Sequence, residues 1–193
     1  MDQYQERYLA HQARKAEILK STYGTPDFKT YSIDEQNDFF KIVENRCSQR
    51  AFISEETDIG NVLYAMNHSP NSCDRKGVYP VVVSERKDKE ILSGLLVGGV
   101  GWIHRADKII LLIADMECYK NPAEQSFMPY LDAGAMLTSA YLAAEVSNLG
   151  CCFVNPNIRD ENKVFFMSRF GLKDNEILCG ALAIGKYELK HRR

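Results

Sequence analysis

Two arginines and a serine lie close together in the stretch NRCSQRAF, at residues 45–52. Arg46, Ser48 and Arg50 alternate with other residues directly after a segment with helical periodicity. Guanidinium groups and a hydroxyl are donors that can hold a phosphate or another anion. The alternative interpretation is a solvated helix end, where charged side chains face water. The motif alone does not decide between an anion site and a solvated turn.

The composition of the chain is that of an ordinary globular protein. It has 193 residues, of which 45% are hydrophobic and 26% charged, enough for one domain with a sizeable core. The formal net charge of −2 gives no reason to expect a nucleic-acid partner. The first 20 residues are too polar for a secretory signal, and the longest apolar stretch, near 133–144, is shorter than a membrane span. We therefore expect a cytoplasmic protein without a membrane partner.

The cysteines and histidines show no spacing that indicates a metal site or an acid–base catalyst. None of the 6 cysteines forms a C-x-x-C pair or a zinc-binding pattern, and the 4 histidines have no recognisable partners. The neighbouring Cys151 and Cys152 lie in an apolar run, where thiols commonly act as small core residues. A redox pair or a metal site is the alternative for them. We predict no metal site and no catalytic side chain.

Helices and strands alternate along the chain in a way that predicts an α+β domain. Apolar periodicity and cap signals predict helices at 2–21, 32–46, within 54–70 with a possible cap at Ser54, and at 88–96, 130–150 and 161–172. Apolar, β-branched runs predict strands at 78–85, 108–116, 151–154 and 176–188.

Three of these segments carry more detailed expectations. Pro80 favours an edge strand or an early position within its strand, and the continuously apolar segment 108–116 predicts a strand buried on both faces. The alanine-rich helix at 130–150 is expected to be a core helix that ends at Gly150. The helix at 2–21 is too polar to form a core. We therefore predict an N-terminal helical extension and linker over 1–28 and one domain over 29–193.

Four of the segments, taken in order, carry a resemblance to a known family. RCSQRAF at 46–52 looks like the motif R-R-S-x-R-x-F, and SPNSCDRKGV at 69–78 looks like P-S-S-x-N-x-Q-P-W. The helix and strand at 130–154 are similar to D-x-G-A-A-x-Q-N-L-x-L-A-A-x-x-x-G-L-G-x-C-W-I, and 179–188 looks like a closing L-A-L-G-Y-P strand. In this order and spacing, the chain resembles the nitroreductase family of FMN-dependent oxidoreductases.

The resemblance implies a fold, an assembly and an activity. The fold is a central mixed β-sheet sandwiched by helices, with a long buried core helix, and the assembly is a homodimer with FMN at the subunit interface. The activity is that of an oxidoreductase, which takes a hydride from NAD(P)H onto flavin N5 and passes the electrons to a small acceptor. Nitroaromatic or quinone-like molecules are the acceptor classes that the resemblance implies.

The resemblance also assigns the residues that bind the cofactor. Arg46, Cys47, Ser48 and Arg50 are expected to hold FMN, either all at its phosphate or with one arginine at the polar edge of the isoalloxazine ring. Asp74 stands where the family has an asparagine that bonds the flavin. As a carboxylate it can only accept hydrogen bonds.

Further cofactor contacts come from two other loops and the C-terminus. Lys76 corresponds to the family's glutamine. In the loop NPNI, Pro156 has no N–H, so the backbone of Asn157 or of a neighbour is expected to face flavin N5. Lys190 and Arg192 are candidates for the phosphate, and a frayed basic tail is the alternative for both.

Other functions remain open at this point. Within the family, the chain could fragment flavin or remove a halogen instead of reducing an acceptor. A dimeric regulatory protein that kept the fold and lost turnover is a third alternative. For a reductase, the segments 98–106 and 118–130 are expected to shape the acceptor pocket, and the helix at 2–21 is a hypothetical clasp for the partner subunit.

Overall fold

The computed structural model describes residues 2–23 and 30–188 of the chain. The chain divides into two compact units, Met1–Asp38 and Phe39–Arg193, and each is described by itself. Most of the predicted linker before residue 29 lies outside the described residues, so the border predicted at 28–29 stays a prediction.

The first unit contains one complete helix and the start of another. Helix α1 spans Gln3–Tyr23, and its side chains are exposed from residue 2 to residue 18. Helix α2 spans Ile33–Asn45 and begins in this unit. The Ser32 hydroxyl accepts from the Glu35 N–H at 3.2 Å and the Glu35 carboxylate accepts from the Ser32 N–H at 2.8 Å. This reciprocal capping box explains why α2 starts at this point.

The second unit is built around a four-stranded sheet. Its strands are β1 (Val78–Val83), β2 (Lys108–Asp115), β3 (Gly150–Val154) and β4 (Glu176–Gly185). They lie in the order β1-β2-β4-β3, and all three strand pairs are antiparallel. The parallel pairing that the described residues contain is an isolated bridge between Ser48 and Cys151. Strand β1 with Pro80 is an edge strand, as predicted.

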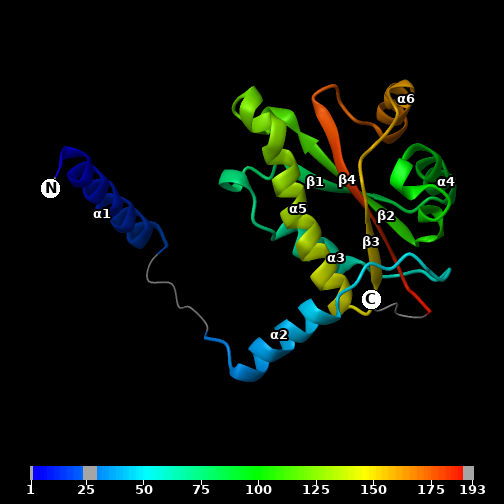
Figure 1. The fold of residues 1–193 in the computed structure, drawn as a ribbon, viewed down its shortest axis with the longest axis horizontal. Helices are drawn as coiled ribbons and strands as arrows, with labels where there is room; N and C mark the ends of the chain where they lie inside the picture. The colour runs from blue at the N-terminus through cyan, green and yellow to red at the C-terminus, as the bar shows by residue number, and fades with distance from the viewer. Residues whose placement is uncertain (1, 24–29, 189–193) are drawn as a thin grey trace. The chain divides into compact units, whose positions relative to one another are not determined.

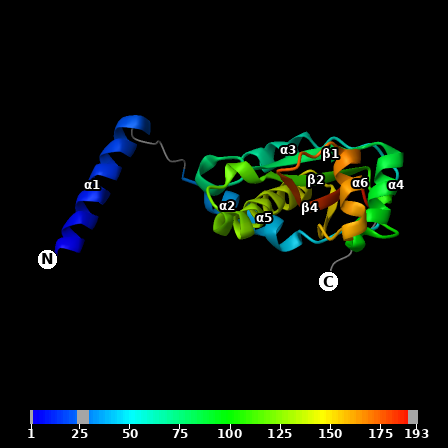
Figure 2. The same cartoon turned by 90° about the horizontal axis from the view of Figure 1, so that it is seen from above.

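Helices cover both faces of this sheet (Figure 1, Figure 2). They are α3 (Gly60–Asn67), α4 (Arg86–Leu95), α5 (Pro122–Val146) and α6 (Asp160–Phe170), with short 3-10 turns at 72–74, 97–99, 103–105 and 116–118. Along β2, side chains alternate between two cores because successive residues of a strand point to opposite faces. Ile110 and Leu112 pack in the core with α3 and α5, and Ile109 and Leu111 in the core with α4 and α6. The strand is therefore buried on both faces, as predicted.

Helix α5 starts earlier than predicted. The prediction placed its start at residue 130 and assigned the preceding segment, 118–130, to an acceptor pocket. In the structure α5 begins at Pro122, and Asn121 caps it by accepting from the Glu124 N–H at 2.9 Å. Proline is well accommodated in the first turn, where its missing N–H has no helical partner. The second proline, Pro129, lies inside the helix and is buried.

The end of α5 also corrects the prediction. The helix ends at Val146, and Gly150 is the first residue of β3 instead of a C-cap. The left-handed residue at this end is Asn148, with φ 55°. The Leu149 N–H then donates to the Ala144 carbonyl at 2.8 Å. Asparagine tolerates this conformation better than most residues, so it takes the place predicted for glycine.

Two other expectations can be compared with the structure. Ser54 does not cap α3, which begins at Gly60 after an N-cap residue, Ile59, that makes no side-chain cap bond. Cys151 and Cys152 are buried in β3, and all 6 cysteines are free thiols. This supports their interpretation as core residues.

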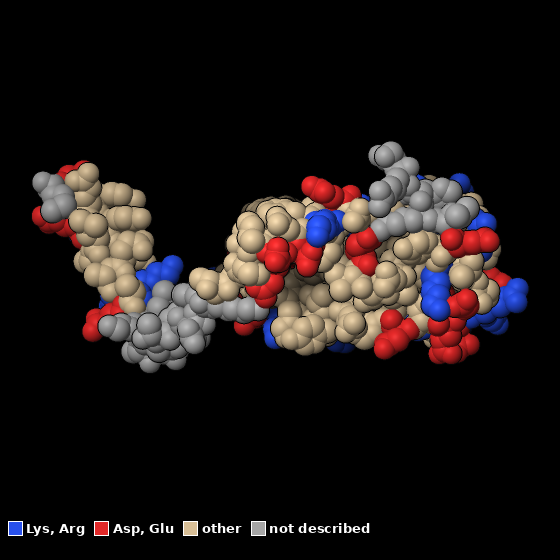
Figure 3. Space-filling model, turned by 90° about the horizontal axis from the view of Figure 1, so that it is seen from below, with Lys and Arg blue, Asp and Glu red and all other residues tan. Residues whose placement is uncertain are grey.

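The surface mixes both signs of charge and carries exposed apolar side chains. On the face drawn in Figure 3, acidic and basic side chains are interspersed between broad uncharged areas. On α5, Phe127, Tyr130, Leu131 and Val146 are about half exposed or more, although the opposite side of the helix is buried. Among the described residues, no helix combines the length and the apolar character that crossing a membrane requires.

Candidate cofactor site

The segment 46–50, which we call the anion arm, runs beside the edge strand β3. Ser48 bridges Cys151, and the Gln49 N–H donates to the Cys151 carbonyl at 2.9 Å. Gln49 is 1% exposed, whereas Ser48 and Arg50 are exposed. This alternation is expected of an extended segment with one face on the protein. The backbone of the arm is thereby fixed to the sheet, and the side chains of Ser48 and Arg50 are presented outward.

Each arginine of the anion arm lies over an aromatic ring. The Arg46 guanidinium carbon is 5.2 Å from the centroid of the Tyr141 ring, and that of Arg50 is 5.8 Å from the Trp102 ring. Within the described part of the chain, neither guanidinium forms an ion pair with a carboxylate. A ring face holds the guanidinium plane without using its N–H donors. The arm therefore carries two positive groups whose donors are available to an anion.

Tyr141 of α5 is the residue that ties this arm to the sheet. Its hydroxyl oxygen lies 3.2 Å from the Ser48 hydroxyl, and it accepts from the Phe153 N–H at 2.7 Å. Burial raises the pKa of Tyr141, although its bonds with Ser48 and Phe153 lower it in part. The phenol is therefore neutral at physiological pH.

The thiols near the arm are neutral as well. Burial raises the pKa of Cys152, and the nearby Arg50 charge opposes this increase only in part. Burial also raises the pKa of Cys151 well above its ordinary value. Cys47, which the resemblance assigns to the cofactor, is half-buried and its sulfur accepts from the Gln49 amide at 3.1 Å. The thiols of Cys151 and Cys152 therefore supply no thiolate nucleophile to this site.

The loop that follows β3 is held by its own side chains. The Asn157 N–H donates to the Asn155 side-chain oxygen at 3.2 Å, and the Asn157 carbonyl accepts from the Val97 N–H at 3.1 Å. A Cβ added at Gly98 would lie 3.4 Å from the Asn155 side chain. The loop and the glycine-rich segment are therefore packed together. The Asn157 N–H already has an acceptor in this conformation.

The loop with Asp74 and Lys76 is anchored to the N-terminal half of α5. The Asp132 carboxylate is buried and accepts from the Ser72 N–H at 2.9 Å and from the Ser72 hydroxyl at 2.8 Å. Its second oxygen accepts from the Tyr119 hydroxyl at 2.9 Å. Asp74 and Lys76 have positive φ values of 54° and 51°, and both are exposed.

Within one chain, the structure does not bring Asp74 and Lys76 to the anion arm. Their loop leads directly into β1, whereas Ser48 is bonded to β3, and β1 and β3 are opposite edges of the sheet. The two anchoring residues on α5, Asp132 and Tyr141, are nine residues apart, which corresponds to about 14 Å along a helix. The predicted residues thus form two separate groups.

The C-terminal candidates cannot be placed in either group. Lys190 and Arg192 lie outside the described residues. Among the residues that are described, no group of His, Cys, Asp and Glu has the arrangement of a metal site.

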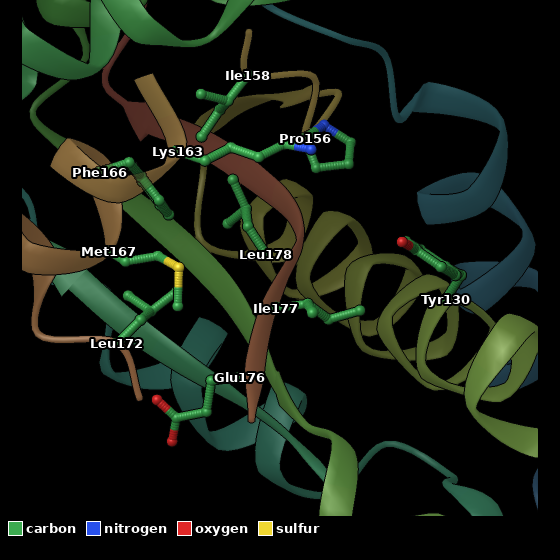
Figure 4. A pocket seen from close by; sticks show the side chains of 10 residues that line it. All are labelled: Tyr130, Pro156, Ile158, Lys163, Phe166, Met167, Leu172, Glu176, Ile177 and Leu178. Atoms are coloured by element: carbon green, nitrogen blue, oxygen red, sulfur yellow. The ribbon is translucent and has the colours of Figure 1, made fainter. Parts of the chain in front are cut away.

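An apolar cavity of about 290 Å³ lies beside the loop that follows β3. β3 pairs only with the Ala181–Gly185 part of β4. The cavity lies beside the earlier part of β4, at Glu176–Leu178, which β3 does not cover. Its wall is formed by Tyr130, Pro156, Ile158, Lys163, Phe166, Met167, Leu172, Glu176, Ile177 and Leu178. Figure 4 shows Pro156 and Lys163 at one end, Glu176 at the other, and the Tyr130 hydroxyl directed toward the gap from α5. Tyr130 comes from a segment that was predicted to shape an acceptor pocket.

Known proteins share this architecture. About four fifths of the chain superposes on solved nitroreductase-type structures, although the sequences are less than 25% identical and the likeness therefore shows the fold alone. NfrA2 of B. megaterium has a TM-score of 0.72 and 18% identity, over 81% of this chain and 69% of that one.

Two other similar structures have names that state a cofactor. The NADPH:FMN oxidoreductase of Vibrio harveyi, solved in complex with NAD+, has a TM-score of 0.70 and 16% identity, over 81% of this chain and 73% of that one. The FMN-dependent nitroreductase of Clostridium difficile has a TM-score of 0.68 and 20% identity, over 79% of this chain and 90% of that one.

The sequence itself gives the decisive match. No curated protein sequence matches this chain at a significant level. The family model of the nitroreductase family, however, matches residues 85–186, more than half of the chain. This match covers β2, α5, β3 and β4, and it includes Tyr141 of α5 and Cys151 of β3, which contact the anion arm. The chain belongs to the nitroreductase family.

Proposed function

We propose that this protein is a cytoplasmic FMN-dependent oxidoreductase that accepts hydride from NAD(P)H and passes electrons to a small acceptor. The observation that carries the proposal is the anion arm. It has two guanidinium groups on either side of an exposed hydroxyl at the edge of the sheet, and neither pairs with a carboxylate of the described residues. This set of donors fits a phosphate group.

The two arginines of the arm can contact different parts of the cofactor. Arg46 and Arg50 are four residues apart, which is about 13 Å in an extended segment. Each guanidinium is held on a different ring, so the two charges lie at different points along the arm. We assign Arg46 and Ser48 to the phosphate end. Arg50 is then the cation at the polar edge of the flavin ring, where a positive charge favours the reduced flavin.

The separation of the two groups of predicted residues supports a homodimer. Asp74 and Lys76 lie at the opposite edge of the sheet from the anion arm, so they would reach the cofactor of a partner subunit. The exposed apolar side chains of α5 supply a surface for such an interface. We further propose that Lys190 and Arg192 add charge at the phosphate.

The N-terminal extension, residues 1–28, is proposed to clasp the partner subunit. The side chains of α1 are exposed from residue 3 to residue 18, whereas most of the stability of a helix in a protein comes from packing one of its faces. Deleting residues 1–28 should therefore weaken self-association, measured by analytical ultracentrifugation over a range of concentrations. An unchanged dimer affinity would refute this part of the proposal.

The chain's own residues would bind and orient, and the flavin would supply the chemistry. A bound flavin accepts a hydride from a nicotinamide and returns electrons to a second substrate. The protein supplies the anion arm, the Asn157 backbone and an apolar cavity beside it that excludes water. We propose nitroaromatic or quinone-like molecules as acceptors, because the cavity wall is mostly apolar.

One observation favours a second function, a flavin-binding protein without turnover. The Asn157 N–H, proposed to face flavin N5, already donates to Asn155. A flavin would have to replace that bond or do without the N–H.

The test is the visible spectrum of the purified protein before and after anaerobic addition of NADPH or NADH. A yellow protein that bleaches supports the oxidoreductase. A yellow protein that stays yellow with both nucleotides supports the flavin-binding protein. A colourless protein that does not bind added FMN would refute both.

A further inference from the structure

Tyr141 makes three different contacts at the cofactor site, although it stands at a position that the family motif leaves open. Its ring lies under the Arg46 guanidinium, at 5.2 Å. Its hydroxyl is 3.2 Å from the Ser48 hydroxyl and 2.7 Å from the Phe153 N–H. One side chain of α5 thus contacts both donors that we assign to the phosphate end, together with the strand beside them.

The hydroxyl contacts have a direction. The Phe153 N–H can only donate, so the Tyr141 oxygen is the acceptor in that bond. The Tyr141 hydrogen is then available to the Ser48 oxygen at 3.2 Å. Either hydroxyl can be the donor in this contact; when Tyr141 donates, the Ser48 hydrogen is free to donate to an anion. Burial raises the pKa of Tyr141, which keeps the required hydrogen in place.

The ring of Tyr141 contacts the second phosphate donor, the Arg46 guanidinium. A guanidinium on a ring face keeps all five N–H donors, whereas an ion pair with a carboxylate would occupy two of them. Tyr141 therefore orients Arg46 without competing with an anion for it. The hydroxyl and the ring thus act on two different residues of the anion arm.

We propose that Tyr141 is a positioning residue that sets the phosphate-binding end of the anion arm. The inference rests on the proposed FMN function and deepens it. It makes a specific statement: Tyr141 acts on the recognition of the flavin's phosphate and leaves the recognition of its ring unchanged. A residue that only joined α5 to β3 would affect both equally.

The experiment compares two ligands that differ in the phosphate. Equilibrium binding of FMN and of riboflavin is measured by flavin fluorescence for the wild type, Tyr141→Phe and Tyr141→Leu. Tyr141→Phe removes the hydroxyl and keeps the ring, and Tyr141→Leu removes both. Tyr64→Phe is the matched control, because Tyr64 is 65% exposed on α3, away from the arm. Circular dichroism checks that each variant is folded.

We expect Tyr141→Phe to weaken FMN binding about three- to tenfold, the usual effect of one hydrogen bond. Tyr141→Leu should weaken FMN binding further, and riboflavin binding should change less than about twofold in both variants. The control should bind both flavins as the wild type does. If FMN binding is unchanged in Tyr141→Phe, or if both flavins lose affinity equally, the inference is wrong and the proposed function still stands. If the wild type binds neither flavin, the proposed function itself fails.

Discussion

The buried carboxylate of Asp132 should be a major source of stability for the loop that carries Asp74 and Lys76. It accepts three hydrogen bonds, two from Ser72 and one from the hydroxyl of Tyr119, which is 3% exposed. Hydrogen bonds to a charged acceptor contribute about 1.5–3 kcal/mol each, and bonds that share an acceptor are not additive. Burial, followed by the bond with Asp132, raises the pKa of Tyr119 far above its ordinary value, so its hydroxyl remains a donor.

The perturbations that test this are Asp132→Ala and Asp132→Asn. Alanine leaves the buried Tyr119 hydroxyl without an acceptor and both Ser72 donors unpaired. We expect it to lower the free energy of unfolding by about 3 kcal/mol. Asparagine keeps one acceptor oxygen for Ser72, and the Tyr119 hydroxyl can rotate to accept from the new amide. Its cost should be about 1 kcal/mol.

The assay is urea unfolding of the flavin-free protein, followed by circular dichroism at one fixed protein concentration, because a dimer's stability depends on concentration. The reasoning would be refuted by an Asp132→Ala variant within about 0.5 kcal/mol of the wild type. It would also be refuted if asparagine cost as much as alanine.

Two further predictions concern the core and its edge. Burial raises the pKa of Asp107, but bonds from Lys108 and Thr57 outweigh it and hold the pKa below its ordinary value. The ionised Asp107 therefore stabilises the fold above about pH 4, and this stabilisation is lost as the pH falls through the folded-state pKa. Asp107→Asn should reduce the loss of unfolding free energy at acid pH, measured by urea unfolding at a series of pH values. A pH profile identical to that of the wild type would contradict this prediction. A Cβ added at Gly180 would lie 2.5 Å from the Phe153 ring, so Gly180→Ala should cost about 1–3 kcal/mol of unfolding free energy. The cost should shrink in a Phe153→Leu background, and an equal cost in both backgrounds would contradict this explanation.

The sequence predicted the order of elements and the family because these depend on local patterns. The continuous apolar run at 108–116 predicted a strand buried on both faces, whereas the motif around Arg46 left an anion site and a solvated turn as alternatives. Helix α5 was predicted too short at one end because its prolines look like breaks, although Pro122 occupies a first-turn position where proline fits. At its other end, Asn148 took the left-handed position predicted for Gly150.

The structure adds what depends on contacts between distant segments. Tyr141 and Trp102 hold the two arginines of the anion arm, and neither residue has a sequence signal for that role. Trp102 lies in the segment 98–106, which was expected to shape the acceptor pocket. An aromatic residue in an apolar helix or loop is more often part of a core, so its role as a guanidinium platform becomes visible only in three dimensions.

The most direct test of the central claim is FMN binding by the wild type and by the Arg46→Gln/Arg50→Gln double variant. Glutamine keeps a polar side chain of similar size and removes the charge. The wild type should bind about one FMN per chain. The double variant should bind at least about a hundredfold more weakly, since it loses two charge-assisted contacts. An FMN affinity that is the same in both proteins would contradict the claim that the anion arm holds the cofactor.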